Sequence, residues 1–294
     1  MNASITHNIR FKLTALLEMI KFSHTVFAFP FALMGMILAA LVSHQPPTGL
    51  QVLWICLAMV GARTGAMGLN RLIDARIDAA NPRTAQRHIP AGKVSITEGW
   101  LLVAAAFALM LVAAWQLNPL CLQLAPVAIF FLVLYSYCKR FTSLAHLVLG
   151  LCLAAAPLGA WIALRGDVGW PIVVLSFAVL FWVAGFDIFY ALQDLDFDRE
   201  RGLFSIPSRL GVARSFQIAR LFHLLMVLLL LLLVFVPGLG AIYLAGVATV
   251  TGLLYYEHRL VRPEDLSRLD AAFFNMNGYI SVTIFLFTLV DALF

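Results

Sequence analysis

The chain has 294 residues, of which 62% are hydrophobic and only 12% are charged, and its mean hydropathy is +0.93. A soluble globular domain carries about twice that share of charged residues, so the composition excludes one. The formal net charge of +5 therefore has to be explained within a membrane protein.

Long apolar runs recur along the whole chain and predict a single-domain, all-α integral membrane protein over residues 1–294. About 20 apolar residues cross the hydrocarbon core, whereas barrel strands would alternate apolar and polar residues over about ten positions. Residues 1–21 predict an amphipathic helix on the membrane surface, because apolar and basic residues are interspersed there. Nine transmembrane helices in one bundle are predicted, over about 22–42, 50–70, 98–116, 119–138, 144–164, 170–190, 213–235, 238–256 and 273–293.

The basic residues predict how these helices are oriented. With the N-terminus in the cytoplasm, the inward-facing segments and helix ends hold 18 of the 20 Lys and Arg residues. Arg165 then faces outward, and Arg63 lies within a span. Cytoplasmic loops of membrane proteins carry such an excess, so the net charge reflects topology and does not indicate binding to nucleic acid. The loops expected to face inward are 71–97, 139–143, 191–212 and 257–272.

Two polar loops, 71–97 and 191–212, follow the second and sixth predicted helices and resemble each other. The first begins "NRLIDARIDAANPRTAQRHIPAG", and its polar residues at four-residue steps are Asn70, Asp74 and Asp78. The second loop lies in "YALQDLDFDRERGLFSIPSRLG", and the same step there joins Tyr190, Asp194 and Asp198. Corresponding aspartates are 120 residues apart, which indicates an internal repeat with a site between its halves.

The spacing within each loop predicts a metal and phosphate site. Residues at i, i+4 and i+8 lie on one helix face, so each loop presents two carboxylates together. Two such surfaces facing each other suit Mg²⁺, which takes a few carboxylates and leaves positions for phosphate oxygens. Basic residues that could neutralise phosphate charge are Arg83, Arg87, Lys93, Lys139, Arg140, Arg199 and Arg201. A metal-bridged diphosphate with a lipid tail is therefore favoured over charges that are simply solvated.

Two other classes of membrane protein share part of this pattern. A secondary transporter also has repeats and intramembrane acids, but its site lies near the bilayer midplane, and these acids stand at helix ends. Counter-flow uptake in proteoliposomes would separate the two. A CDP-alcohol phosphotransferase also uses paired aspartates, but the upstream DG…AR that it needs is absent before Asp74 and Asp194.

The two loops resemble the aspartate-rich motifs of the UbiA superfamily of intramembrane prenyltransferases. The first loop is similar to NxxxDxxxD followed by a basic stretch, and the second is similar to the second motif. Arg63 and "YSYCKRFTSLAHLVLG" at 135–150 extend the resemblance over most of the chain. It is closest to the 4-hydroxybenzoate polyprenyltransferase branch, including relatives assigned to menaquinone synthesis by the futalosine route. The chain departs from the common R-P-L of the basic loop, where it reads Arg87-His88-Ile89-Pro90. This departure bears on the acceptor more than on the diphosphate chemistry.

The resemblance implies an enzyme that transfers a polyprenyl chain from polyprenyl diphosphate to a small aromatic acid such as 4-hydroxybenzoate. Ubiquinone or menaquinone biosynthesis would be its pathway, and Mg²⁺ would be its cofactor. It implies a protein embedded in the lipid of the bacterial inner membrane, with the active site on the cytoplasmic side. Other acceptors used within the superfamily, such as haem, chlorophyll or naphthoate, remain open alternatives.

The resemblance also implies roles for individual residues. The carboxylates that act in catalysis and, together with Asn70, hold Mg²⁺ are Asp74, Asp78, Asp194 and Asp198. The basic residues expected to bind diphosphate oxygens or the carboxylate of the acceptor are Arg63, Lys139 and Arg140, beside Arg83 and Arg87 of the basic loop. Asp187 and Tyr190, one or two turns before Asp194, are candidates to steady the substrate in that region.

Overall fold

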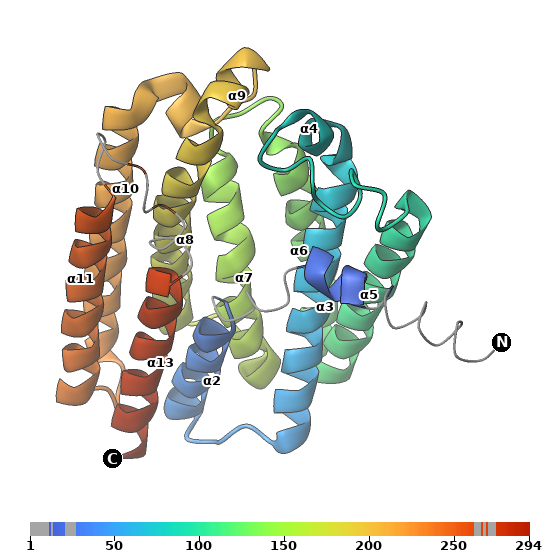
Figure 1. The fold of residues 1–294 in the computed structure, drawn as a ribbon. Coiled ribbons are helices and arrows are strands. Elements are labelled where there is room, and N and C mark those ends of the chain that lie inside the picture. The colour runs from blue at the N-terminus through green and yellow to red at the C-terminus, as the bar shows by residue number, and fades with distance from the viewer. Residues whose placement is uncertain (1–11, 13, 21–27, 262–265, 267–268, 270–274) are drawn as a thin grey trace.

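The computed structural model describes residues 12, 14–20, 28–261, 266, 269 and 275–294. These residues form helices and turns and contain no β-strand, and the helices stand side by side in one bundle (Figure 1). In chain order the elements are α2 (Phe29–Ser43), α3 (Gly49–Ile73), α4 (Ala75–Ala80), α5 (Ile96–Leu117), α6 (Pro119–Cys138), α7 (Ala145–Arg165), α8 (Trp170–Ala191), η2 (Leu192–Asp194), α9 (Leu195–Glu200), α10 (Ile206–Leu232), η3 (Leu233–Phe235), α11 (Ala241–Leu260) and α13 (Asn277–Leu293).

Six segments among the described residues are long and apolar enough to cross a membrane. They are Gly49–Ile73, Ile96–Leu117, Pro119–Cys138, Ala145–Arg165, Trp170–Glu200 and Ile206–Phe235. The helices α2 and α13 are apolar but shorter. The prediction of an all-α membrane protein is confirmed for the described residues, whereas the count of nine crossings stays a prediction.

Part of the predicted amphipathic segment 1–21 packs on the protein. Its described residues include a helical stretch over 14–19, and Ala15, Met19 and Ile20 are buried against Val94 at the end of the first polar loop. The rest of that segment lies outside the described residues. So do the predicted beginnings of the first and last spans and most of the loop 257–272.

The polar residues at the helix ends explain where the helices begin. Capping boxes start α3, α5 and α10. In each, the side chain of the capping residue accepts from the backbone N–H three residues later, and the side chain of that later residue accepts from the backbone N–H of the capping residue. The capping residues are Thr48, Ser95 and Ser205. Within α10, Gly211 has a φ of 78°, a left-handed value that favours glycine. The first turn of α10 is therefore bent away from the remainder, and it stays with the polar loops.

The largest buried cluster joins α7 and α8 to α2, α10, α11 and α13, around Trp161, Trp182 and Tyr243. The α7 and α8 backbones approach each other closely at Gly150, because a Cβ atom there would overlap the carbonyl oxygen of Leu180. Small residues at such positions let transmembrane helices pack tightly, since lipid offers no hydrophobic drive for helix association. The close approach sets the position of α8, which carries part of the polar site.

We expect Gly150→Ala to destabilise the protein, because the added methyl group forces the backbones of α7 and α8 apart. Overpacking of this kind costs about 1–3 kcal/mol. Gly252→Ala is the matched control, since a Cβ atom at that helical glycine meets nothing within 4 Å. The measurement is the thermal unfolding midpoint of each purified variant in detergent. Equal midpoints for the two variants would contradict the close approach.

Candidate functional site

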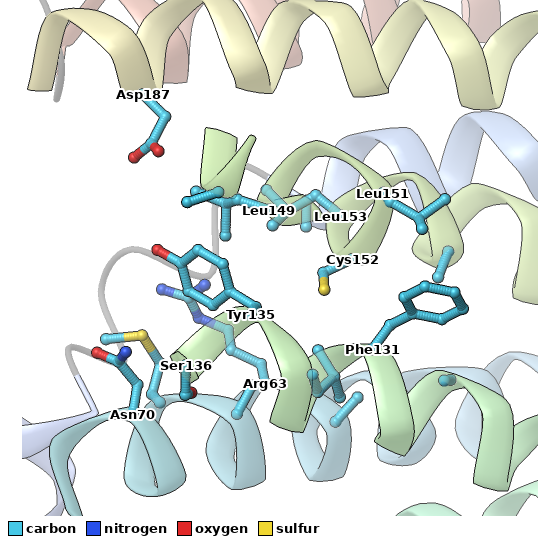
Figure 2. Close-up of a pocket in the computed structure, with 18 of the residues that line it drawn as sticks. Arg63, Asn70, Phe131, Tyr135, Ser136, Leu149, Leu151, Cys152, Leu153 and Asp187 are labelled. Atoms are coloured by element: carbon cyan, nitrogen blue, oxygen red, sulfur yellow. The ribbon is translucent and has the colours of Figure 1, made fainter. Parts of the chain in front are cut away.

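A cavity of about 680 Å³ lies between α3, α6, α7 and α8 and extends from the two polar loops into the bundle. Apolar side chains such as Phe131, Leu149 and Leu153 line its deeper part (Figure 2). Its other end is lined by the aspartates of both loops. One continuous space thus joins a charged mouth to an apolar interior.

The first loop keeps its four-residue step although the helix is interrupted. α3 ends at Ile73, and Asp74 separates it from α4. The backbone N–H of Asp74 donates to the Asn70 carbonyl at 2.9 Å, and that of Asp78 donates to the Asp74 carbonyl at 2.8 Å. These are the i to i−4 bonds of a helix. Asn70 also donates through its side-chain amide to Asp74 Oδ2 at 3.2 Å, so the polar residues of this motif lie together.

The second loop presents its aspartates from a short helical segment. Asp194 ends η2, and Asp198 lies in α9 directly after it. Ser205, the capping residue of α10, donates to Asp198 Oδ2 at 3.1 Å. The same residue therefore starts α10 and orients a carboxylate of the motif.

Asp194 joins the two loops. Arg83 donates from Nε to Asp194 Oδ1 at 2.8 Å and also forms an ion pair with Oδ2, while Asn81 Nδ2 donates to Oδ1 at 2.8 Å. The Arg83 guanidinium further donates to the Tyr190 hydroxyl at 3.0 Å and lies over its ring. Burial acts to lower the pKa of Arg83, but its bonds to Asp194 and Tyr190 outweigh burial and raise the pKa above the ordinary value.

The aspartates of the first loop are also held by basic residues. Asp74 forms ion pairs with Lys139 at 2.6 Å and Arg140 at 2.9 Å, and Asp78 forms one with Arg87 at 2.6 Å. Asp74 and Asp78 are each only 2% exposed. Three of the four motif carboxylates, Asp74, Asp78 and Asp194, therefore each have a basic partner. Lys139 and Arg140 come from a loop that is distant in sequence, whereas Arg87 belongs to the same loop as Asp78, nine residues away.

Eleven of the twelve predicted site residues line this one cavity: Arg63, Asn70, Asp74, Asp78, Arg83, Arg87, Lys139, Asp187, Tyr190, Asp194 and Asp198. Arg140 is the exception, since its guanidinium is bonded to the Ser136 and Ile73 carbonyls and to Asp74. Arg140 thus contacts the cavity through an aspartate. Three further basic residues expected near phosphate do not line the cavity: Lys93, Arg199 and Arg201.

The donor chemistry of the mouth fits a hard divalent cation. Carboxylate and amide oxygens are the ligands that Mg²⁺ prefers, and both motifs turn such oxygens toward one cavity. Asp78 Oδ2 is buried and has no hydrogen-bond partner among the described residues, so it is available to a ligand. In the described part of the chain, no three His, Cys, Asp or Glu residues are close enough to hold a metal ion by themselves. A bound ion would therefore need further oxygens, such as those of a diphosphate.

Deeper in the cavity two polar groups face each other across the apolar walls. Arg63 reaches in from α3 beside Tyr135 of α6, and Asp187 reaches in from α8 on the opposite side (Figure 2). Arg63 Nε is buried without a hydrogen-bond partner in the described structure. Asp187 Oδ2 lies 2.7 Å from His146 Nδ1.

Sequence reasoning missed several polar residues at this site: Arg71, Asn81, Tyr135, His146 and Ser205. Arg71 and Asn81 stand beside the first motif, so their proximity was a usable signal. His146 is buried in α7. The sequence shows it as a polar residue within an apolar run, which was a second usable signal. Its partner could not be read from the sequence, because Asp187 is 41 residues away on another helix.

The model of the UbiA prenyltransferase family matches residues 28–279. The chain belongs to this family. It is accordingly an enzyme of prenyl transfer and an integral membrane protein.

Individual UbiA relatives agree with this assignment. The chain is 30% identical over 237 residues to the 4-hydroxybenzoate octaprenyltransferase of Nitrosospira multiformis, covering 81% of each sequence. It is 32% identical over 251 residues to the enzyme of that name from Vibrio cholerae, covering 84% of this chain and 86% of the other.

Solved structures of UbiA homologues share the fold. The apo structure of the homologue from Aeropyrum pernix K1 is 33% identical, with a TM-score of 0.82 over 92% of this chain and 98% of that one. The homologue from Archaeoglobus fulgidus bound to GPP and Mg²⁺ is 17% identical, with a TM-score of 0.71 over 95% and 100% of the two chains. At that identity the second comparison bears on the fold alone.

We expect Arg87→Met to lower stability by about 3 kcal/mol, because it leaves the buried Asp78 carboxylate without its cation. The double variant Arg87→Met/Asp78→Asn should recover much of this loss. The control is Arg165→Met, whose partner Asp167 is 50% exposed and whose ion pair should contribute less than about 1 kcal/mol. Thermal or chemical unfolding in detergent measures all three. A loss no larger than that of the control would show that Asp78 does not depend on Arg87.

Proposed function

We propose that this UbiA protein transfers a polyprenyl chain from polyprenyl diphosphate to an aromatic acid such as 4-hydroxybenzoate, in ubiquinone or menaquinone biosynthesis. The proposal depends on one observation above all, the cavity whose aspartate-rich mouth continues into an apolar interior. A prenyl diphosphate has the same division into a charged head and an apolar tail. The names of the relatives support the aromatic acid, and the basic loops support a site at the cytoplasmic face of a bacterial inner membrane.

The mouth of the cavity would hold Mg²⁺ and the diphosphate. The residues proposed to hold the metal are Asn70, Asp74, Asp78, Asp194 and Asp198. A divalent ion there supplies charge stabilisation to the diphosphate as it leaves. Arg83, Arg87 and Lys139 each form an ion pair with one of these aspartates. A diphosphate would compete for the same cations, and it would gain charge-assisted bonds from them.

The acceptor would bind deeper, near Arg63. Its buried Nε atom has no hydrogen-bond partner among the described residues, and a guanidinium pairs well with a planar carboxylate. The carboxylate of an aromatic acid would satisfy it, with Lys139 as a second cation and Arg140 acting through Asp74. Tyr190 and Asp187 line the opposite wall and would keep the ring in place.

The apolar walls would protect the reacting carbon. Breaking the allylic C–O bond leaves a carbocation that water would capture, and the deeper lining is mostly aliphatic and aromatic. Exclusion of water also strengthens the electrostatic interactions within the site. The electron-rich ring then attacks the allylic carbon. The lipid tail would extend along the apolar part of the cavity toward the bilayer.

Removal of divalent metal should abolish turnover, because the diphosphate would lose the charge stabilisation that helps it leave. EDTA treatment should stop transfer from geranyl diphosphate, and added Mg²⁺ or Mn²⁺ should restore it. Asp74→Asn and Asp194→Asn should each remove nearly all activity. Product formation is followed with radiolabelled donor. Full turnover in chelator would contradict the metal role.

A panel of acceptors tests the substrate class directly. The purified protein with Mg²⁺ and radiolabelled polyprenyl diphosphate should prenylate an aromatic acid such as 4-hydroxybenzoate, and it should leave the matching phenol that lacks a carboxylate almost unreacted. The reason is that a buried Arg63 left without its anion disfavours the uncharged acceptor. The panel should include naphthoate, haem and chlorophyll precursors. Transfer to one of these but to no benzoate would redirect the proposal to that acceptor.

A further inference from the structure

His146 is fixed in one protonation form by its two neighbours. Its Nε2 atom lies 3.2 Å from the backbone nitrogen of Ile206, the first residue of α10. A backbone N–H can only donate, so Nε2 accepts and carries no hydrogen. An imidazole ring retains at least one N–H, so Nδ1 must carry it. Nδ1 therefore donates to Asp187 Oδ2 at 2.7 Å.

This arrangement holds Asp187 as a hydrogen-bond acceptor facing the cavity. His146 is only 2% exposed, so its ring has no freedom to turn to another partner. Asp187 Oδ1 has no hydrogen-bond partner among the described residues, and both carboxylate oxygens point into the pocket in Figure 2. The neutral imidazole orients the carboxylate without neutralising its charge. One oxygen remains free for a proton from the cavity.

Asp187 differs from the other carboxylates that line this cavity. Asp74, Asp78 and Asp194 are ion-paired with basic residues at the mouth. Asp198 lies at the mouth as well, in α9. Asp187 stands seven residues before Asp194 on the same wall, which is about 10 Å deeper along a helix. It is therefore the carboxylate at the depth of the apolar walls, opposite Arg63 (Figure 2).

The proposed reaction releases one proton at that depth. The allylic C–O bond breaks, and its electron pair leaves with the diphosphate. A ring carbon next to the phenolic hydroxyl donates a π pair and forms the new C–C bond. The C–H bond at that carbon then breaks, its electrons restore the aromatic ring, and the proton has to go to a base. Water is a poor choice for this base in a cavity that has to exclude it.

We infer that Asp187 is the base that takes the proton from the prenylated ring, and that His146 is the residue that positions it. This inference rests on the proposed function, because it requires an aromatic acceptor. Asp187 becomes a neutral carboxylic acid in the step and later returns the proton to solvent with the released diphosphate. A positioned general base of this kind contributes about 10²–10⁴-fold to the rate.

The test compares 4-hydroxybenzoate with the same acid deuterated at both ring positions next to the hydroxyl, using geranyl diphosphate and Mg²⁺. Asp187→Asn keeps an oxygen that can accept from His146, so the fold should be retained. We expect its kcat to fall about 10²–10⁴-fold, while the KM for geranyl diphosphate changes less than about threefold. The isotope effect on kcat should be larger than in the wild type, because breaking the C–H bond now limits turnover. A lower kcat with an unchanged isotope effect would overturn the role as base.

Variants of His146 test the positioning role separately. Gln carries one donor and one acceptor, so His146→Gln can keep the contacts with Ile206 and Asp187, whereas His146→Leu loses both. We expect His146→Leu to lower kcat and raise the isotope effect, and His146→Gln to restore both toward the wild type. Equal defects in the two variants, with no change in isotope effect, would overturn the inference even if Asp187→Asn does not fold.

The wild type and a control variant separate this inference from the proposed function. Asp167→Asn removes a carboxylate that is bonded to Trp161 and Arg165 in the turn before α8, away from the cavity lining. This variant should leave kcat and the isotope effect unchanged. If the wild type prenylates no aromatic acceptor, the proposed function itself fails, and this is seen before any variant is measured. If the wild type is active and only the Asp187 and His146 results are negative, the function stands and the base lies elsewhere.

Discussion

The pairing of carboxylates on one loop with basic residues on another is the interaction on which the site depends. Four aspartates at one end of a membrane bundle would repel one another strongly if they were alone. Asp194 is held by Arg83 and Asn81 of the other motif, and Asp74 by Lys139 and Arg140 of the loop between α6 and α7. Taking one partner from a buried ion pair is far more costly than the pair itself is stabilising. The ion pairs consequently hold the loops in place relative to one another, and the same charges are those that the proposed chemistry would use.

This construction has a direct consequence for the substrate. Under the proposed function, a diphosphate at the mouth would meet cations already in place, and the carboxylates that it displaced would be free to hold a divalent ion. The apolar walls behind the mouth would then contribute mainly by excluding water, since a lipid tail gains little by moving from bilayer to protein.

The deeper part of the cavity differs from the mouth in its polar groups. There the polar groups are few, and each is held by a specific partner or left open to the cavity. His146 uses one ring nitrogen to accept from the first N–H of α10 and the other to orient Asp187 on α8, so it connects three helices. The close contact of α7 with α8 at Gly150 supports this geometry, because it fixes the distance between the helices that carry His146 and Asp187.

The sequence by itself determined the class of the protein and most of the residues that line the mouth of its cavity. Apolar runs need no partner to be recognised, and the four-residue steps at Asn70, Asp74 and Asp78 place their side chains together on any helix. Capping residues such as Ser95 and Ser205 likewise mark helix starts locally. For that reason the twelve predicted residues included eleven that share one cavity.

Only the tertiary structure decided which charged residues pair and which residue forms a hydrogen bond with Asp187. Arg83 and Asp194 are 111 positions apart, and no period in the sequence relates them. The same holds for His146 and Asp187, and for Arg140, which reaches an aspartate and two backbone carbonyls and is absent from the cavity lining. Such contacts depend on how the helices pack and how the loops cross, and packing is a property of the whole bundle that local sequence patterns do not contain.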